Sequence, residues 1–316
     1  MKALYSRAYL DHISFDDMLI PFDRYLYKLE HQRKEIAKLK FHEKDFLFKA
    51  MHAFYEGSGD KRYNIYKVPE LKECLFYWIF LQHSNKIMSF DGIIPGPNKR
   101  MLTPNEKRRN KRYFHEYLQV WKNKVEKGEG AYLSIIKPAL YRKIKDWQEL
   151  AKQKNISPNF LKQKELYVYG CFFDIYYHVK LFFDELPTPF IIRTINGIDV
   201  VFNVYSFVHI YSRHYIPNMN YELNDASMNP ELDVVDLDEL PYSILGLLER
   251  FNELFPITKY TEYCLYTLDG VKYILWLKHK KLNETKQDGL EVRSFYRCTK
   301  NVDLLKFENN NWLVLR

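Results

Sequence analysis

The stretch PTPFIIRTINGIDVVFNV, residues 187–204, decides the fold of the second half of the chain. Two runs rich in β-branched and aromatic residues, 190–195 and 198–204, flank an Asn-Gly dipeptide at 196–197. Asn-Gly is a strong signal for a two-residue hairpin turn, so the pattern predicts two antiparallel strands. Two prolines open the stretch and interrupt the helical pattern before it. The chain therefore changes here from helix to sheet.

A second hairpin is expected where Asp-Gly at 269–270 separates the β-rich runs Glu262–Leu268 and Val271–Lys280. With the helices expected beside it, this half forms an α+β module of roughly 130–150 residues, a normal domain size. The other elements expected here are a short helical segment at 207–216, an acidic loop at 222–239, a helix at 241–255, and strands at 290–299 and 313–315.

Upstream of residue 187, the apolar residues recur with the 3.6-residue period of helices. Thr103-Pro104, for instance, is typical of a helix N-cap followed by the first helical position. We therefore predict an α+β protein, with a basic helical domain over residues 1–160 and a helix-plus-antiparallel-sheet domain over 161–316. The expected helices cover residues 14–40, 42–55, 69–82, 104–127, 131–154 and 158–185.

The sequence lacks the usual signals of secreted, membrane-spanning or metal-binding proteins. No apolar stretch precedes Asp11, so we expect no secretory signal. The longest strongly apolar run, 74–81, is far shorter than the roughly 20 residues that a bilayer requires. The four cysteines form no CxxC pair, which favours neither a structural zinc site nor disulfides and suits a reducing compartment. We expect a cytoplasmic protein with no metal, no cofactor and no membrane contact.

The charge is distributed unevenly along the chain. Residues 161–316 carry 17 Lys/Arg and 21 Asp/Glu, whereas residues 1–160 carry 31 and 19, so the whole basic surplus belongs to the first half. Seven of these cations fall between Lys99 and Arg112, among them Arg108 and Arg109. A basic face attracts phosphate backbones, which favours RNA binding at Arg108, Arg109 and Arg112. The alternative is that lysine-rich helices only keep themselves solvated.

The segment VHIYSRHY, residues 208–215, is the main candidate for chemistry. Two imidazoles, His209 and His214, can act as base and acid in a phosphodiester transfer because their ordinary pKa is near neutrality. Arg213 can hold the phosphate and offset the charge of the transition state. His209 and Arg213 are four residues apart and would share one face of a helix. Alternatively, His209 caps or packs, and Arg213 pairs with the acidic loop downstream.

The strand expected at 290–299 contains a second group of candidates. Strict alternation would place Arg293 and Arg297 on one face and Ser294 and Tyr296 on the other. On the preceding strand, Lys272, Lys278 and Lys280 share a face with Trp276. Cations beside an aromatic ring can bind phosphates and bases. The alternative is an ordinary solvated face on which lysines discourage edge pairing.

This arrangement resembles the nuclease superfamily of barnase, EndoU, colicin and RelE ribonucleases (the BECR fold), especially its phage- and toxin-associated members. The resemblance covers roughly residues 165–316 and depends on the His-x-x-x-Arg-His element after a hairpin and on the closing Arg-Ser-Phe-Tyr strand. It implies metal-independent RNA cleavage, with an antitoxin or immunity protein as a possible partner. It also implies His209 as general acid or base, Arg213 and Arg293 as phosphate ligands, Ser294 as a polar site residue and His214 as a second acid or base.

A competing pattern lies in the basic helix expected at 104–127. Arg109, Asn110 and His115 resemble the phosphate-binding and proton-transfer residues of HEPN ribonucleases, an all-helical family. Arg109 and His115 are six positions apart, about 240° around an ideal helix, so Arg112 shares the face of His115 instead.

Three interpretations follow from the sequence. The first is a metal-independent endoribonuclease that acts by acid/base transesterification in the second half of the chain. The second is a non-enzymatic factor that binds nucleic acid or protein, in which the histidines are structural. The third is a HEPN-like ribonuclease that uses the basic helix. Convergence of His209, Arg213, Arg293 and a lysine into one open cleft would favour the first.

Overall fold

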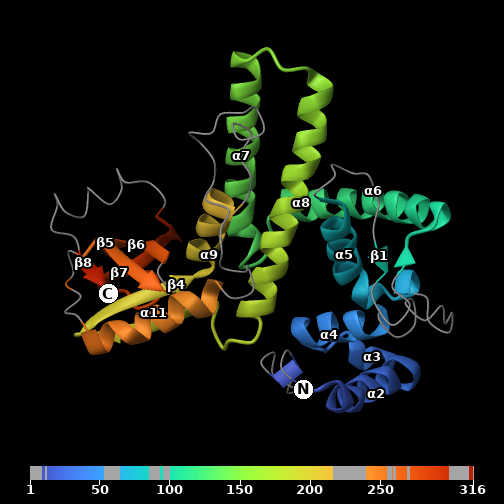
Figure 1. Ribbon diagram of the computed structural model, residues 1–316, viewed down its shortest axis with the longest axis horizontal. Helices are drawn as coiled ribbons and strands as arrows, with labels where there is room; N and C mark the ends of the chain where they lie inside the picture. The colour runs from blue at the N-terminus through green and yellow to red at the C-terminus, as the bar shows by residue number, and fades with distance from the viewer. Residues whose placement is uncertain are drawn as a thin grey trace. The chain divides into compact units, whose positions relative to one another are not determined.

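The computed structural model describes residues 9–10, 13–52, 65–84, 93–94, 100–215, 240–254, 258, 261–268, 271–298 and 313–315. Helices precede a mixed β-sheet, which confirms the predicted α+β fold (Figure 1). The chain forms two compact units, each built from two segments. Unit 1 comprises residues 1–127 and 154–185, and unit 2 comprises residues 128–153 and 186–316.

This grouping differs from the predicted division into one domain over residues 1–160 and another over residues 161–316. Helix α7 (Leu133–Gln153) belongs to unit 2, where it packs against helix α9 (Val204–Ile210), whereas α8 (Pro158–Phe183) belongs to unit 1. Both helices have the same 3.6-residue pattern, and that pattern does not say which partner a helix packs against. The consequence for function is that a basic helix from the first half of the sequence lies beside the candidate catalytic segment.

Unit 1 is a helical unit centred on α5 (Lys72–Ser84), α6 (Pro104–Lys127) and α8. Thr103 caps α6 as predicted, because its Oγ1 accepts the N–H of Glu106 at 3.3 Å. The predicted helix at 14–40 divides at Gln32, whose backbone leaves the helical region (φ −133°, ψ 46°). The other elements of unit 1 are α2 (Phe15–His31), α3 (Arg33–Ile36), α4 (Phe41–Met51), the 3₁₀ turns η2 (Ile65–Lys67) and η3 (Pro69–Leu71), and the short strands β1 (Ile93–Ile94) and β2 (Arg100–Met101).

A charged cluster ties the three central helices of unit 1 together. Glu73 on α5 accepts hydrogen bonds from Lys124 on α6 at 2.6 Å and from Lys180 on α8 at 2.7 Å. Lys124 also donates to the hydroxyl of Tyr176 at 2.9 Å. Because one carboxylate pairs with both lysines, its loss would leave both cations without this partner. None of the helices in the described ranges has an apolar stretch that would cross a bilayer.

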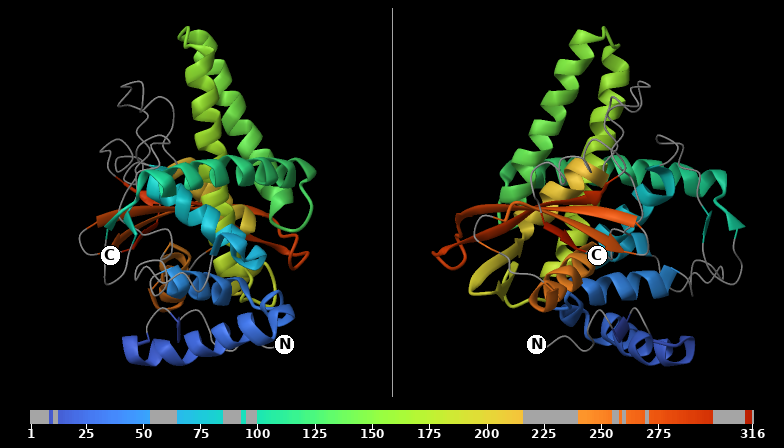
Figure 2. Two further views of the ribbon diagram at one scale, coloured as in Figure 1. Left: turned by 90° about the vertical axis from the view of Figure 1, so that its right-hand side faces the viewer. Right: turned by 60° about the vertical axis from the view of Figure 1, so that its left-hand side comes forward.

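Unit 2 contains a sheet with the strand order β3-β4-β7-β6-β5-β8. The sequence predicted an antiparallel sheet, but the sheet is mixed, because β4 pairs with β7 and β5 pairs with β8 in parallel. Both predicted hairpins form: Ile195 pairs with Ile198, and Leu268 pairs with Val271. In both views of Figure 2, α9 and α11 (Leu240–Leu254) lie on opposite sides of the sheet. The strands are β3 (Phe190–Ile195), β4 (Ile198–Asn203), β5 (Tyr263–Leu268), β6 (Val271–Lys281), β7 (Asp288–Arg297) and β8 (Leu313–Leu315).

A β-bulge in β7 interrupts the strict alternation of side chains that the sequence predicted for this strand. Trp276 pairs with Ser294 and Leu277 pairs with Val292, which leaves Arg293 as an extra residue. A bulge redirects the side chain at its position. Arg293 accordingly forms an ion pair with Glu291, at 2.8 Å, instead of following the strict period of the strand.

Candidate functional site

Helix α9 begins immediately after strand β4, and a side-chain cap fixes its first turn. Asn203 Oδ1 accepts the N–H of Ser206 at 2.9 Å, and Ser206 Oγ accepts the N–H of Asn203 at 3.5 Å. These bonds satisfy backbone donors that an uncapped helix would leave unpaired. The helix then widens into a π-helical turn, η4 (Tyr211–Tyr215). Such turns occur frequently at functional sites.

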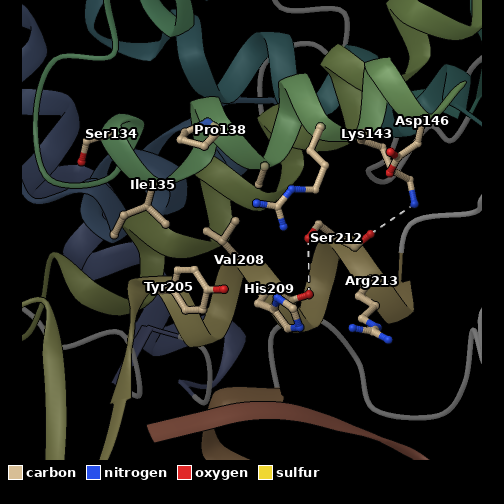
Figure 3. Close-up of a pocket in the computed structure, with 12 residues that line it drawn as sticks. Ser134, Ile135, Pro138, Lys143, Asp146, Tyr205, Val208, His209, Ser212 and Arg213 are labelled. Atoms are coloured by element: carbon tan, nitrogen blue, oxygen red, sulfur yellow. Dashed lines mark hydrogen bonds between the residues drawn. The ribbon is translucent and has the colours of Figure 1, made fainter. Parts of the chain in front are cut away.

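An open cleft of about 410 Å³ lies between α7 and the α9–η4 segment. Figure 3 shows Lys143 on α7 and, facing that helix, the α9–η4 segment with His209 and Arg213. Arg142 of α7 also lines the cleft. We call it the α7–α9 cleft. It is lined by Ser134, Ile135, Pro138, Ala139, Arg142, Lys143, Asp146, Tyr205, Val208, His209, Ser212 and Arg213.

The α7–α9 cleft has an excess of positive charge. Arg142, Lys143 and Arg213 line it, and Asp146 is the one carboxylate among its described lining residues. Lys143 donates to the carbonyl oxygen of Ser212 at 3.4 Å, which joins α7 to η4. Guanidinium groups are suited to phosphate oxygens because their N–H groups form a planar fork. An anion such as a phosphate group is therefore the ligand that this cleft favours.

His209 is half-buried in the wall of this cleft and stacks on Tyr205, with ring centroids 5.8 Å apart and planes at 20°. Its Nε2 is enclosed and has no hydrogen-bond partner in the described structure. Burial, followed by the charges of Arg213, Arg293 and Arg142, lowers the pKa of His209 to about 4. The imidazole is therefore neutral at pH 7 and can accept a proton.

A second cavity, also of about 410 Å³, adjoins the first and shares Ile135 and Tyr205 with it. The guanidinium of Arg293 lies over the ring of Tyr205, 4.5 Å from its centroid, and thus reaches toward His209 from the sheet. We call this cavity the β7 pocket. It is lined by Ala131, Ile135, Pro189, Phe190, Asn203, Val204, Tyr205, Lys280, Asn283, Glu284, Glu291 and Arg293.

Glu291 is the buried centre of the β7 pocket, with a relative exposure of 2%. It accepts hydrogen bonds from Lys280 at 2.8 Å, from Arg293 at 2.8 Å and from Asn203 at 3.3 Å. Burial alone would raise the pKa of Glu291, but Lys280 and Arg293 outweigh that effect and hold it below the ordinary value. The cluster fixes Arg293 beside the α7–α9 cleft.

The structure gathers part of the predicted catalytic set. His209 and Arg213 line one cleft, and Arg293 lines the adjoining pocket. His214 follows in η4, but its side chain lies outside the described part of the structure. Ser294 is buried, with a relative exposure of 2%, and lines neither cavity. Lys272 and Lys278 are exposed on β6 and line neither cavity.

The residues predicted on the basic helix belong to unit 1. Arg108 is exposed and donates to Asn105, and Arg112 is exposed and pairs with Glu116 at 3.8 Å. The guanidinium of Arg109 lies 3.9 Å from the centroid of the Tyr66 ring.

The HEPN-like interpretation gains little from this helix. Asn110 is fully buried and accepts a hydrogen bond from Tyr66, whereas His115 is exposed. A buried amide that is already bonded to a tyrosine is poorly placed to bind phosphate together with His115.

Sequence reasoning missed Arg142, Lys143 and Tyr205. The two cations lie more than sixty residues before His209, and nothing local indicates that α7 packs against α9. Tyr205 precedes His209 by four residues, a spacing that places both on one helical face, and this signal was available in the sequence.

No protein-family model, curated protein or solved structure matches the chain. The candidate site is therefore argued from its own geometry and charge.

Proposed function

We propose that the protein is a metal-independent endoribonuclease whose reaction takes place in the α7–α9 cleft. The observation that carries this proposal is a neutral histidine, His209, in the wall of an open cleft together with Arg142 and Arg213. Among the residues that the structure describes, neither arginine forms an ion pair, so their charge is available to an incoming phosphate. Arg293 supports the same site from the adjoining pocket.

The reaction would be attack of a ribose 2′-oxygen on the adjacent phosphorus. A bond forms between O2′ and phosphorus, and the bond from phosphorus to O5′ breaks. His209 takes the proton of the 2′-hydroxyl, and the leaving O5′ takes a proton from a second acid, for which His214 is the candidate from the sequence. Arg142 and Arg213 would stabilise the added charge on the phosphate oxygens. The products are a 2′,3′-cyclic phosphate end and a 5′-hydroxyl end.

The Nε2 of His209 is enclosed and has no hydrogen-bond partner among the described residues, which leaves Nδ1 as the ring nitrogen for contact with a ligand. We therefore expect Nδ1 to meet the substrate. A bound phosphate would offset the positive charges that lower the pKa of His209, and the imidazole would become a stronger base in the complex than in the free protein.

The experiment that tests the proposed function is cleavage of end-labelled RNA by the purified protein in excess EDTA. We expect cleavage with and without added Mg²⁺, because no metal takes part in the steps above. The fragments should carry cyclic phosphate ends, identified by mass spectrometry. Absence of cleavage, or cleavage that requires a divalent metal, would overturn the proposal and leave a non-enzymatic binding protein.

That second candidate, an RNA-binding protein without catalysis, is favoured by an exposed basic stripe on α6. Arg108, Lys111 and Arg112 are all exposed, and together with His115 they recur at helical spacing on one face. The buried residues of α6, which include Asn110, Phe114 and Leu118, lie on the neighbouring face. RNA binding through this stripe is compatible with either function.

We expect charge reversal of the stripe, R108E/K111E/R112E, to weaken RNA binding and to flatten its dependence on salt. Each lost phosphate contact should reduce the slope of log Kd against log salt by about 0.7–0.9. Arg109 is left intact because it packs on Tyr66. Fluorescence anisotropy over a salt series is the measurement. The matched control reverses the exposed lysines Lys152, Lys154 and Lys162. Equal affinity of the stripe variant and the wild type would refute the assignment.

A further inference from the structure

The two adjoining cavities of unit 2 differ in charge. The α7–α9 cleft has three cationic side chains and one carboxylate, whereas the β7 pocket has two cations, Lys280 and Arg293, and two carboxylates, Glu284 and Glu291. A phosphate therefore favours the cleft, and an uncharged group favours the β7 pocket. Because Tyr205 and Ile135 line both cavities, one nucleotide can place its phosphate in the first and its base in the second.

The β7 pocket retains one unused acceptor and one unused donor. Glu284 Oε1 accepts from Asn203 at 2.8 Å, but Glu284 Oε2 is buried and has no hydrogen-bond partner in the described structure. Arg293 donates to Glu291 through Nη1, and its Nε is likewise buried and unpartnered. Leaving such groups unsatisfied costs free energy, so a ligand that supplies a donor for Glu284 is favoured.

The position of Glu284 is fixed by the turn that joins β6 to β7. Leu282 N–H donates to the carbonyl of Gln287 at 2.8 Å, and Lys286 N–H donates back to Leu282 at 3.0 Å. Lys286 takes a positive φ of 62°, which closes the turn. Around the carboxylate, the pocket has apolar walls: Ala131, Ile135, Pro189, Phe190 and Val204. A flat ring with an N–H donor on its edge suits apolar walls and a single acceptor.

We propose that the β7 pocket binds the base of a nucleotide whose phosphate lies in the α7–α9 cleft, and that Glu284 selects bases with an exocyclic amino group. This inference builds on the proposed function. The amino group of cytosine can donate to Glu284 Oε2, and a carboxylate accepting from this group is a known mode of base recognition. Uracil presents a carbonyl oxygen at the same position, and two oxygen acceptors repel one another.

Cytidine and uridine monophosphates are the matched probes, because their bases differ at this position and their phosphates are the same. Isothermal titration calorimetry in EDTA should give cytidine monophosphate an affinity at least about 5-fold higher than that of uridine monophosphate. Glu284→Gln should reduce this preference to near unity, because an amide can donate as well as accept. The control Glu262→Gln, at an exposed position that lines neither cavity, should keep the preference. Unchanged binding of inorganic phosphate would show that the cleft of each variant is intact.

The outcomes separate this inference from the proposed nuclease. A cytidine preference that depends on Glu284 would support the base pocket even if RNA were never cut. Cleavage of RNA by a protein that binds uridine monophosphate as well as cytidine monophosphate would overturn the base pocket alone. If Glu284→Gln fails to fold, the affinities of the wild type for cytidine and uridine monophosphate still test the base pocket. A preference that survives in a folded Glu284→Gln protein would also overturn it.

Discussion

RNA cleavage by the His209→Ala protein is expected to fall by about 10²- to 10⁴-fold, the usual cost of losing a general acid or base. The imidazole lines the α7–α9 cleft and stacks on Tyr205, so its removal takes away the proton acceptor without touching Arg142 or Arg213. RNA affinity should change little. Single-turnover cleavage and anisotropy, measured on the same preparations, separate the two effects.

The matched control is His279→Ala. His279 is exposed on β6 and lines neither cavity, so its removal should leave the rate unchanged. Arg213→Ala should also lose cleavage, because one of the phosphate-stabilising cations is gone. Cleavage that survives His209→Ala but disappears in His115→Ala would move the site to α6 and contradict the assignment.

The pH profile of the wild type provides a second readout of the same assignment. The side chains of Arg142, Lys143 and Asp146 approach His209 from α7, Arg213 from η4, and Arg293 and Glu291 from β7. Burial and the cations lower the pKa of His209 to about 4, and only the neutral form accepts a proton. The limb of kcat/KM that reports the base should therefore lie at about pH 4, where protonation of His209 stops the reaction. A rate that falls with decreasing pH already at the ordinary histidine pKa of about 6.5 would contradict the proposed environment of His209. A fall with increasing pH would instead report the general acid.

Local signals in the sequence predicted much of the fold. Asn196-Gly197 takes positive φ angles of 52° and 76°, as the hairpin turn requires. The expected helix 104–127 matches the bounds of α6 because both of its ends are marked locally, by Thr103-Pro104 and by Gly128. Segments with such signals need no knowledge of their tertiary partners.

The candidate site depends on contacts that no local pattern contains. His209 and Arg213 were predicted together because one helical turn separates them, but Arg142 and Lys143 reach the cleft through the packing of α7 on α9. A bulge sets the direction of the Arg293 side chain, and strict alternation along β7 does not predict this bulge. Ser294 was a candidate only through the resemblance to the BECR nucleases, and the structure buries it on β7, where it pairs with Trp276.

A second large effect is expected on the stability of unit 1 when the charged cluster of Glu73, Lys124 and Lys180 is broken. Glu73→Gln should lower the free energy of unfolding by about 2–4 kcal/mol, because it removes the carboxylate that pairs with both Lys124 and Lys180. We place the cost below that of a fully buried pair, since the side chain of Lys124 is 38% exposed. Urea unfolding followed by circular dichroism measures the change. The control Glu116→Gln breaks the exposed pair with Arg112 and should cost less than about 1 kcal/mol.

Acid should reduce the difference between wild type and Glu73→Gln. Burial alone would raise the pKa of Glu73, but the charges of Lys180 and Lys124 outweigh it and hold the pKa below the ordinary value of 4.5. A carboxylate with a lowered pKa stabilises the folded state above its unfolded pKa and loses this contribution as the pH falls through the folded value. The two proteins should therefore differ most near neutral pH and converge in acid. A difference that stayed constant from neutral pH into strong acid would show that lost packing, and not the ion pairs, destabilises the variant.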